Sequence, residues 1–198
     1  MISVNLQDIR TSVEGDLAGL GLYLQQLIGE PLLFFRQSYA DELTIHFGTP
    51  IERTSPKLEN RIRGSYVLAT RGSLWTLIST AQGRLILSDL PRQMSDAGLS
   101  RLIVTDLEHS PPVSAGAKLA WALPYPDDLS GGIALALGFS DQTRLVIRPE
   151  PPFFEAVVSS AEIGRDVADW ELLTPIGRYL TIGPGRRWAY LPSKAEKI

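Results

Sequence analysis

The sequence predicts an α+β protein in which β-rich antiparallel sheets, formed from two pseudo-repeated hairpin modules, pack against an N-terminal amphipathic helix. Three observations support this fold class. Apolar residues near the N-terminus recur with the spacing of a helix. Short apolar runs separated by turn residues follow, which is typical of antiparallel strands. A hairpin pattern that contains tryptophan occurs twice, around Trp75 and around Trp170.

The N-terminal stripe advances by three or four residues at a time, so its side chains share one helix face. It consists of Leu6, Ile9, Val13, Leu17, Leu20, Leu24 and Leu27. Gly29 followed by Pro31 is a typical helix end. We therefore expect a helix over about residues 6–28, with a break near Gly15 as an alternative, and we expect its stripe to pack on a sheet. The opposite face is mainly acidic, unlike that of a helix that binds membrane surfaces.

After Pro31 the apolar period becomes that of strands. Leu43, Ile45 and Phe47 alternate with polar residues, which predicts a half-buried strand that ends at Gly48. The polar, proline-containing stretch 49–63 predicts a loop. Further strands or hairpins are expected at residues 32–36, 65–70, 102–107, 118–123, 133–139 with 144–148, and 187–191.

The two tryptophan units align when one residue is dropped from the first turn. Trp75 then matches Trp170, Leu77 matches Leu172, and Gly83-Arg84 matches Gly177-Arg178. A hairpin precedes each unit, so the order of hairpin, loop and tryptophan hairpin covers about residues 32–88 and 131–183. Because such a module of about four strands cannot bury its apolar face alone, we predict a single domain over residues 1–198. Its modules would bury each other's faces or share one larger sheet under the helix.

Four short motifs follow one another along the chain, namely Gly29-Glu30-Pro31-Leu32, Phe47-Gly48, Phe139-Ser140-Asp141 and Trp170-Glu171-Leu172. In the order of these motifs the chain resembles, over most of its length, small uncharacterised bacterial proteins, which are domains of unknown function and in some cases immunity-like. The resemblance implies a compact protein-binding domain and carries over no active-site residues.

Composition excludes several classes of function. The formal net charge of −3 provides no overall attraction to nucleic acid or to anionic membranes. The absence of cysteine excludes disulfides, cysteine-ligated metals and thiol catalysis. No apolar run approaches the roughly 20 residues that a membrane-spanning helix needs, and the N-terminus does not read as a signal peptide. We expect a cytoplasmic protein that binds no membrane, with nucleic acid as a disfavoured partner.

Motifs for catalysis and cofactor binding are missing from the sequence. The two histidines, His46 and His109, lie in no metal-binding pattern, and His46 is expected on the solvent side of its strand. Neither Ser100 nor Ser140 lies in the G-x-S-x-G setting of a nucleophile. No glycine-rich phosphate loop is present. We therefore expect no catalytic residues, no metal and no cofactor.

Four residues form the best candidate ligand site. Asp169 and Glu171 are two apart, so on a strand they share one face opposite Trp170, and solvent exposure is their simplest interpretation. Arg186 and Arg187 follow Gly183-Pro184-Gly185, which reads as a tight turn and, as a minority alternative, as an anion-binding turn.

Three functions remain open. The first is a non-enzymatic domain that binds another protein, as an immunity-like protein or an accessory subunit. The second is an enzyme for a small molecule or anion, with its site between the two modules at the four residues named above. The third is a single-stranded nucleic-acid surface formed by the arginine-rich first half with Tyr66 and Trp75, which the acidic balance disfavours.

Overall fold

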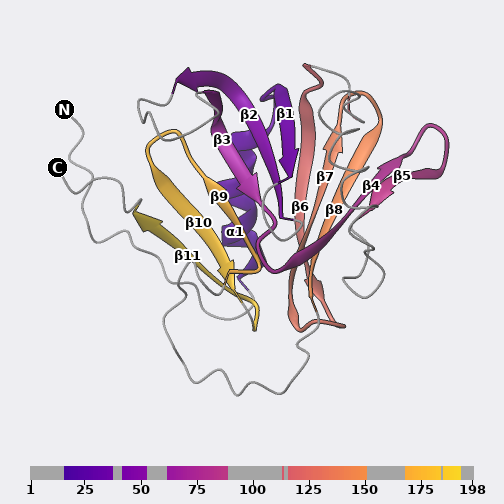
Figure 1. The fold of residues 1–198 in the computed structure, drawn as a ribbon. Helices are drawn as coiled ribbons and strands as arrows, with labels where there is room; N and C mark the ends of the chain where they lie inside the picture. The colour runs from indigo at the N-terminus through magenta and orange to yellow at the C-terminus, as the bar shows by residue number, and fades with distance from the viewer. Residues whose placement is uncertain are drawn as a thin grey trace.

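A computed structural model of the chain describes residues 16–37, 42–52, 62–88, 113, 116–150, 168–183 and 185–192. In these residues the chain forms two antiparallel sheets and one short helix (Figure 1). The elements are α1 (Leu17–Leu24), the 3₁₀ helix η1 (Gln25–Leu27), β1 (Leu32–Gln37), β2 (Leu43–Glu52), β3 (Ile62–Ala69), β4 (Ser73–Ser79), β5 (Arg84–Ser88), β6 (Leu119–Asp127), β7 (Gly132–Phe139), β8 (Thr143–Pro149), β9 (Trp170–Leu173), β10 (Arg178–Gly183) and β11 (Arg187–Pro192). The α+β class with antiparallel sheets is confirmed. The expected strand at 102–107 and the first part of the expected helix lie outside the described residues.

Each sheet combines strands from both halves of the chain. The six-stranded sheet has the order β1-β2-β3-β9-β10-β11, and the five-stranded sheet has the order β5-β4-β8-β7-β6. The hairpin β9–β10, which carries Trp170, joins the meander β1–β3 through β3. The hairpin β4–β5, which carries Trp75, joins the meander β6–β8 through β8. Each tryptophan hairpin therefore completes the sheet of the other half, so neither half forms a sheet alone.

The order β1-β2-β3-β9-β10 has the same connectivity as β6-β7-β8-β4-β5, and contacts between the meanders also occur in matched pairs. Leu32 donates its backbone N–H to the carbonyl of Ala117 at 2.8 Å, and Leu119 donates to the carbonyl of Glu30 at 3.0 Å. A register irregularity follows Leu32 in β1 and Leu119 in β6. The internal pseudo-repeat over about 32–88 and 131–183 stays a prediction. In the structure β6, which precedes residue 131, belongs to the second meander.

Phe47 and Phe139 mark the point where the two meanders meet. Phe47 pairs with Leu32 in the first meander, and Phe139 pairs with Leu119 in the second. Their rings lie nearly parallel, with centroids 6.2 Å apart and planes 12° apart. Because Phe47 and Phe139 hold the same place in their meanders, residue 46 of β2 corresponds to residue 138 of β7, and residue 44 corresponds to residue 136.

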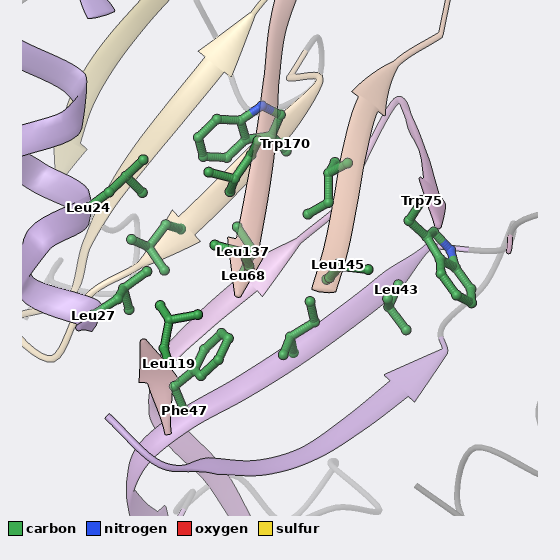
Figure 2. Packing of buried hydrophobic residues seen from close by; sticks show 14 of the residues in the cluster. Leu24, Leu27, Leu43, Phe47, Leu68, Trp75, Leu119, Leu137, Leu145 and Trp170 are labelled. Atoms are coloured by element: carbon green, nitrogen blue, oxygen red, sulfur yellow. The ribbon is translucent and has the colours of Figure 1, made fainter. Parts of the chain in front are cut away.

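One cluster of buried apolar side chains includes residues from α1 and from both sheets (Figure 2). Leu20, Leu24 and Leu27 of the N-terminal stripe are buried in it, as the helical spacing predicts. Trp75 and Trp170 are 2% and 0% exposed, so both are core residues, although they lie in different sheets.

The described helix begins and ends at residues suited to its termini. Asp16 caps α1, and its carboxylate accepts a hydrogen bond from the N–H of Gly19 at 2.9 Å. Gly29 has a φ of 89°, the left-handed conformation that ends helices. The indole of Trp188 on β11 donates to the carbonyl of Asp16 at 3.1 Å. The start of α1 is therefore attached to the edge of the six-stranded sheet.

Two strands are longer than the sequence predicts. β2 does not end at Gly48, because this glycine takes a φ of 81° at a register irregularity and the strand continues to Glu52. β6 passes through Pro124 and Pro126 and ends at Asp127, beyond the strand expected at 118–123. Proline is tolerated there because β6 is at the edge of its sheet.

Candidate functional site

Glu171 is buried and paired, in contrast to the expected solvent-exposed position. It lies on β9 beside Ala69 of β3, and it is 2% exposed. Arg71, in the turn between β3 and β4, donates to Glu171 through Nε at 3.0 Å and through Nη2. The same guanidinium donates through Nη1 to Glu42 at 2.9 Å. A buried carboxylate that is no longer hydrated needs a positively charged partner, which Arg71 provides. Through Arg71 the cluster also connects β9 to the start of β2 and to the β3–β4 turn.

Asp169 is also more buried than expected. Its backbone is fixed on both sides, because its N–H donates to Ile182 at 2.7 Å and its carbonyl accepts from the hydroxyl of Ser73 at 2.7 Å. Oδ2 is buried without a hydrogen-bond partner among the described residues. A Cβ added at Gly132 would lie 3.2 Å from this oxygen, so the carboxyl packs closely against β7. Burial raises the pKa of Asp169 from 3.8 to about 7.

The two candidate arginines lie at the turn between β10 and β11. Arg186 has a φ of 58°, and its Nη2 donates to Asp128 at 2.8 Å in an ion pair that is largely exposed. Arg187 opens β11 opposite Gly183. Among the described ion pairs, one joins Glu171 to Arg71 and another joins Arg186 to Asp128.

A second polar cluster forms around Asp127 at the end of β6. Its Oδ2 accepts from the hydroxyl of Ser130 at 2.7 Å, and its Oδ1 accepts from Nη2 of Arg148 at 2.7 Å. Burial opposes ionisation of this carboxyl, but the hydrogen bonds from Ser130 and Arg148 outweigh it and hold the pKa of Asp127 below its usual value. The cluster fixes the β6–β7 turn, and it leaves the Arg148–Asp127 pair without net charge.

His46 does not face solvent. It is buried, its Nδ1 accepts the backbone N–H of Gly64 at 3.1 Å, and its ring stacks on Phe34 with centroids 4.2 Å apart. These contacts make it a structural histidine that closes β2 onto β3. His109 lies outside the described residues.

The outward side of the five-stranded sheet is unusually apolar. Ile133, Leu135 and Leu137 of β7 are fully buried in the core, so the alternating residues point outward. We call this surface the outer sheet face. By the same alternation and the strand register, its members are Trp121, Leu123 and Tyr125 on β6, Ala134, Ala136 and Gly138 on β7, Arg144, Val146 and Arg148 on β8, and Leu74, Thr76 and Ile78 on β4. Two of these residues are charged, and both are arginines. Asp127, at the end of β6, lies beside this face and pairs with Arg148.

Large and small side chains alternate across this face. The indole of Trp121 lies over Gly138, where an added Cβ would be 2.1 Å from Cε2 of the ring. The guanidinium of Arg144 lies over the same indole, 5.4 Å from the ring centroid. In the next row Ala136 lies between Leu123 and Val146, and Leu123 is 57% exposed. An antiparallel sheet with one face on the core usually carries polar residues on the other face.

The matched positions of the six-stranded sheet are polar. Glu42, Thr44 and His46 correspond to Ala134, Ala136 and Gly138 by the pairing of Phe47 with Phe139. The polar side chains form hydrogen bonds with nearby backbone groups; for example, the hydroxyl of Thr44 donates to the carbonyl of Arg36 at 3.0 Å. At these positions the outward residues are therefore polar on the first meander and apolar on β7, although the register also places Phe34, Val67 and Leu173 on the side of His46. The sequence signal for the outer sheet face lies in Ile133–Phe139, where large residues alternate with alanine or glycine. The periodicity did not show which side of this strand would face away from the core.

Comparison with known proteins gives no assignment: no protein-family profile, no curated protein and no solved structure matches the chain. Within the described residues, no helix is long and apolar enough to cross a membrane. Among the same residues, no group of three or more histidine, aspartate or glutamate side chains is placed to hold a metal ion.

Proposed function

We propose that the protein is a non-enzymatic domain that binds another protein. The observation that carries this proposal is the outer sheet face, an apolar surface with an exposed leucine and two arginines. Contiguous apolar patches on folded proteins mark interaction sites more often than single exposed apolar residues do. Aromatic residues and arginine are also the residue types enriched where proteins bind each other. An immunity-like or accessory role is the finer form of this proposal and rests on the sequence resemblance.

The polar residues support the same choice. Glu171 pairs with Arg71, Asp127 pairs with Arg148, and Arg186 pairs with Asp128. An enzyme with a site between the modules would need such side chains free to meet a substrate. Nucleic-acid binding through the first half is similarly disfavoured, because Arg71 is held by two carboxylates.

Site-specific photo-crosslinking in the native host tests this function. A photoreactive phenylalanine analogue would replace Leu123 on the outer sheet face in one variant and Ile176 in the β9–β10 turn in the other. The two positions are matched in exposure, at 57% and 67%. We expect a defined protein to be crosslinked at position 123 and not at 176, and the purified partner to bind the wild-type chain in calorimetry.

Equal crosslinking at both positions, or none at position 123, would count against a protein-binding role for this face. Turnover of a small molecule by the purified chain would favour the enzymatic alternative instead.

A further inference from the structure

We infer that the outer sheet face binds an acidic segment of another protein, with a carboxylate of that segment at Arg144 and an aliphatic side chain over Ala136. This inference rests on the proposed function and adds the chemistry of the partner. It follows from the charges on the face, from their position and from the shape of the central row.

The charge on the face is unevenly distributed. Arg148 is already paired with Asp127, so the end of the face next to the β6–β7 turn is neutral. Arg144 is exposed, and in the described part of the chain its guanidinium contacts the Trp121 ring, with no carboxylate beside it. A guanidinium stacked on an indole keeps its planar edge available for hydrogen bonds to a carboxylate. The Arg144 end therefore attracts an anionic group.

A second copy of this chain fits the face poorly. Two copies related by a two-fold axis would place one arginine-bearing face against another. The acidic side chain beside this face, Asp127, is buried and already paired with Arg148, so it offers no free carboxylate to Arg144 of a second copy. Like charges opposed across an interface cost free energy. The complementary partner has the opposite charge and carries apolar side chains for Leu123, Ala136 and Val146.

The spacing on β8 gives the spacing in the partner. Arg144 and Val146 are two residues apart on one strand face, which corresponds to about 7 Å. An extended partner segment has the same repeat, so its carboxylate and its aliphatic side chain are expected two residues apart. The small Ala136 leaves room for the aliphatic group between Leu123 and Val146.

Selection from a random library of displayed 12-residue peptides on the full-length chain tests the inference. We expect the selected peptides to carry aspartate or glutamate two residues from leucine, isoleucine or valine. Binding should fall at least tenfold in the Arg144→Glu variant and in the Ala136→Arg variant. Replacing the acidic residue of a selected peptide by arginine should restore its binding to Arg144→Glu, because the charges are then exchanged.

Arg178→Glu is the matched control, since Arg178 lies on the six-stranded sheet with its guanidinium 5.5 Å from the Tyr190 ring. This variant should bind the peptides as the wild type does. Thermal unfolding of each variant shows whether it is folded. If Arg144→Glu does not fold, the Ala136→Arg variant and competition by sodium chloride take its place.

Selected peptides that are basic or neutral, an absence of selected binders, or equal loss in Arg144→Glu and Arg178→Glu would overturn the inference. Stronger binding of a single-stranded oligonucleotide than of the selected peptides, sensitive to Arg144→Glu, would also overturn it. A native partner crosslinked at position 123 through a basic surface would overturn the inference and leave the proposed function standing. Acidic peptides that bind as expected, with no partner crosslinked in the host, would support the binding chemistry of the face and would count against the proposed function.

Discussion

At the scale of single residues, Asp169 shows the largest conflict between a side chain and its surroundings. Its Oδ2 is buried against Gly132 without a hydrogen-bond partner in the described chain, and its pKa is raised to about 7. A carboxyl in this setting is favoured in its neutral form. Protonation of Asp169 is therefore linked to the stability of the contact between β9 and β7.

The sign of this linkage follows from the two pKa values. The unfolded chain has a pKa near 3.8 and the folded chain one of about 7, so the folded state holds the proton more tightly. The stabilisation is complete below about pH 4 and is lost as pH rises through 7, by up to about 4 kcal/mol. Asp127, whose pKa is lowered, has the opposite dependence and matters only at low pH.

We predict that Asp169→Asn raises stability at pH 8 and flattens its dependence between pH 4.5 and 8. Urea denaturation at several pH values measures both effects. Asp128→Asn, at a side chain that is 91% exposed, is the control and should leave the curve as in the wild type. A wild-type chain as stable at pH 8 as at pH 5 would contradict the assignment.

Trp170 supports a second prediction at this scale. Its side chain is fully buried, and its indole donates to the carbonyl of Ile133 at 2.8 Å, which joins β9 to β7. Trp170→Ala should cost about 3–5 kcal/mol, because it leaves a large cavity and an unsatisfied carbonyl. Trp121→Ala, on the outer sheet face, should cost clearly less. Chemical denaturation measures the free energy of unfolding of both variants. Equal losses would show that the burial of Trp170 contributes no more to stability than the position of Trp121 does.

At the scale of elements, ion pairs hold turns against strands. Arg71 joins the β3–β4 turn to β9 through Glu171 and to the start of β2 through Glu42. Glu171 is the most buried member of this cluster. The loss of its partner would leave a carboxylate without compensation in a site that water reaches poorly.

We predict that Arg71→Ala destabilises the protein by roughly 2–4 kcal/mol. The double variant with Glu171→Gln should recover much of this loss, because the unpaired charge is then removed. Arg186→Ala breaks the exposed pair with Asp128 and should change stability little. Denaturation midpoints of the single and double variants give the coupling, and additive losses would mean that the pair is not the source of the effect.

At the scale of the whole molecule, the exchange of tryptophan hairpins joins the two halves. β9–β10 completes the first meander and β4–β5 completes the second, so each sheet depends on residues from both ends of the chain. The buried cluster is also continuous between the sheets (Figure 2). Each tryptophan hairpin belongs to one half of the chain and lies in the sheet that the other half begins. The loss of a hairpin is therefore expected to disrupt both halves.

We therefore predict a single cooperative unfolding transition, in which amides of β3 and β9 exchange hydrogen with the same free energy as amides of β7 and β8. Native-state hydrogen exchange measures this residue by residue. Two separate transitions, or exchange energies that divide between the sheets, would show that the halves fold independently.

The sequence by itself determined the elements with strong local signals. Leucine spacing placed the helix face, Gly29 its end, and alternating residues the hairpin of β7 and β8, because these signals depend on neighbours along the chain.

The tertiary structure decided which residues meet. The exchange of hairpins, the Arg71–Glu171 pair across 100 positions and the burial of Asp169 and His46 all depend on strand partners distant in sequence. Periodicity reports that a strand has two faces, and only packing decides which face is covered. For this reason the candidate site predicted from the sequence lay at acidic residues that were expected on the surface. In the folded chain the apolar face around Ala136 lies on the outside of the sheet instead.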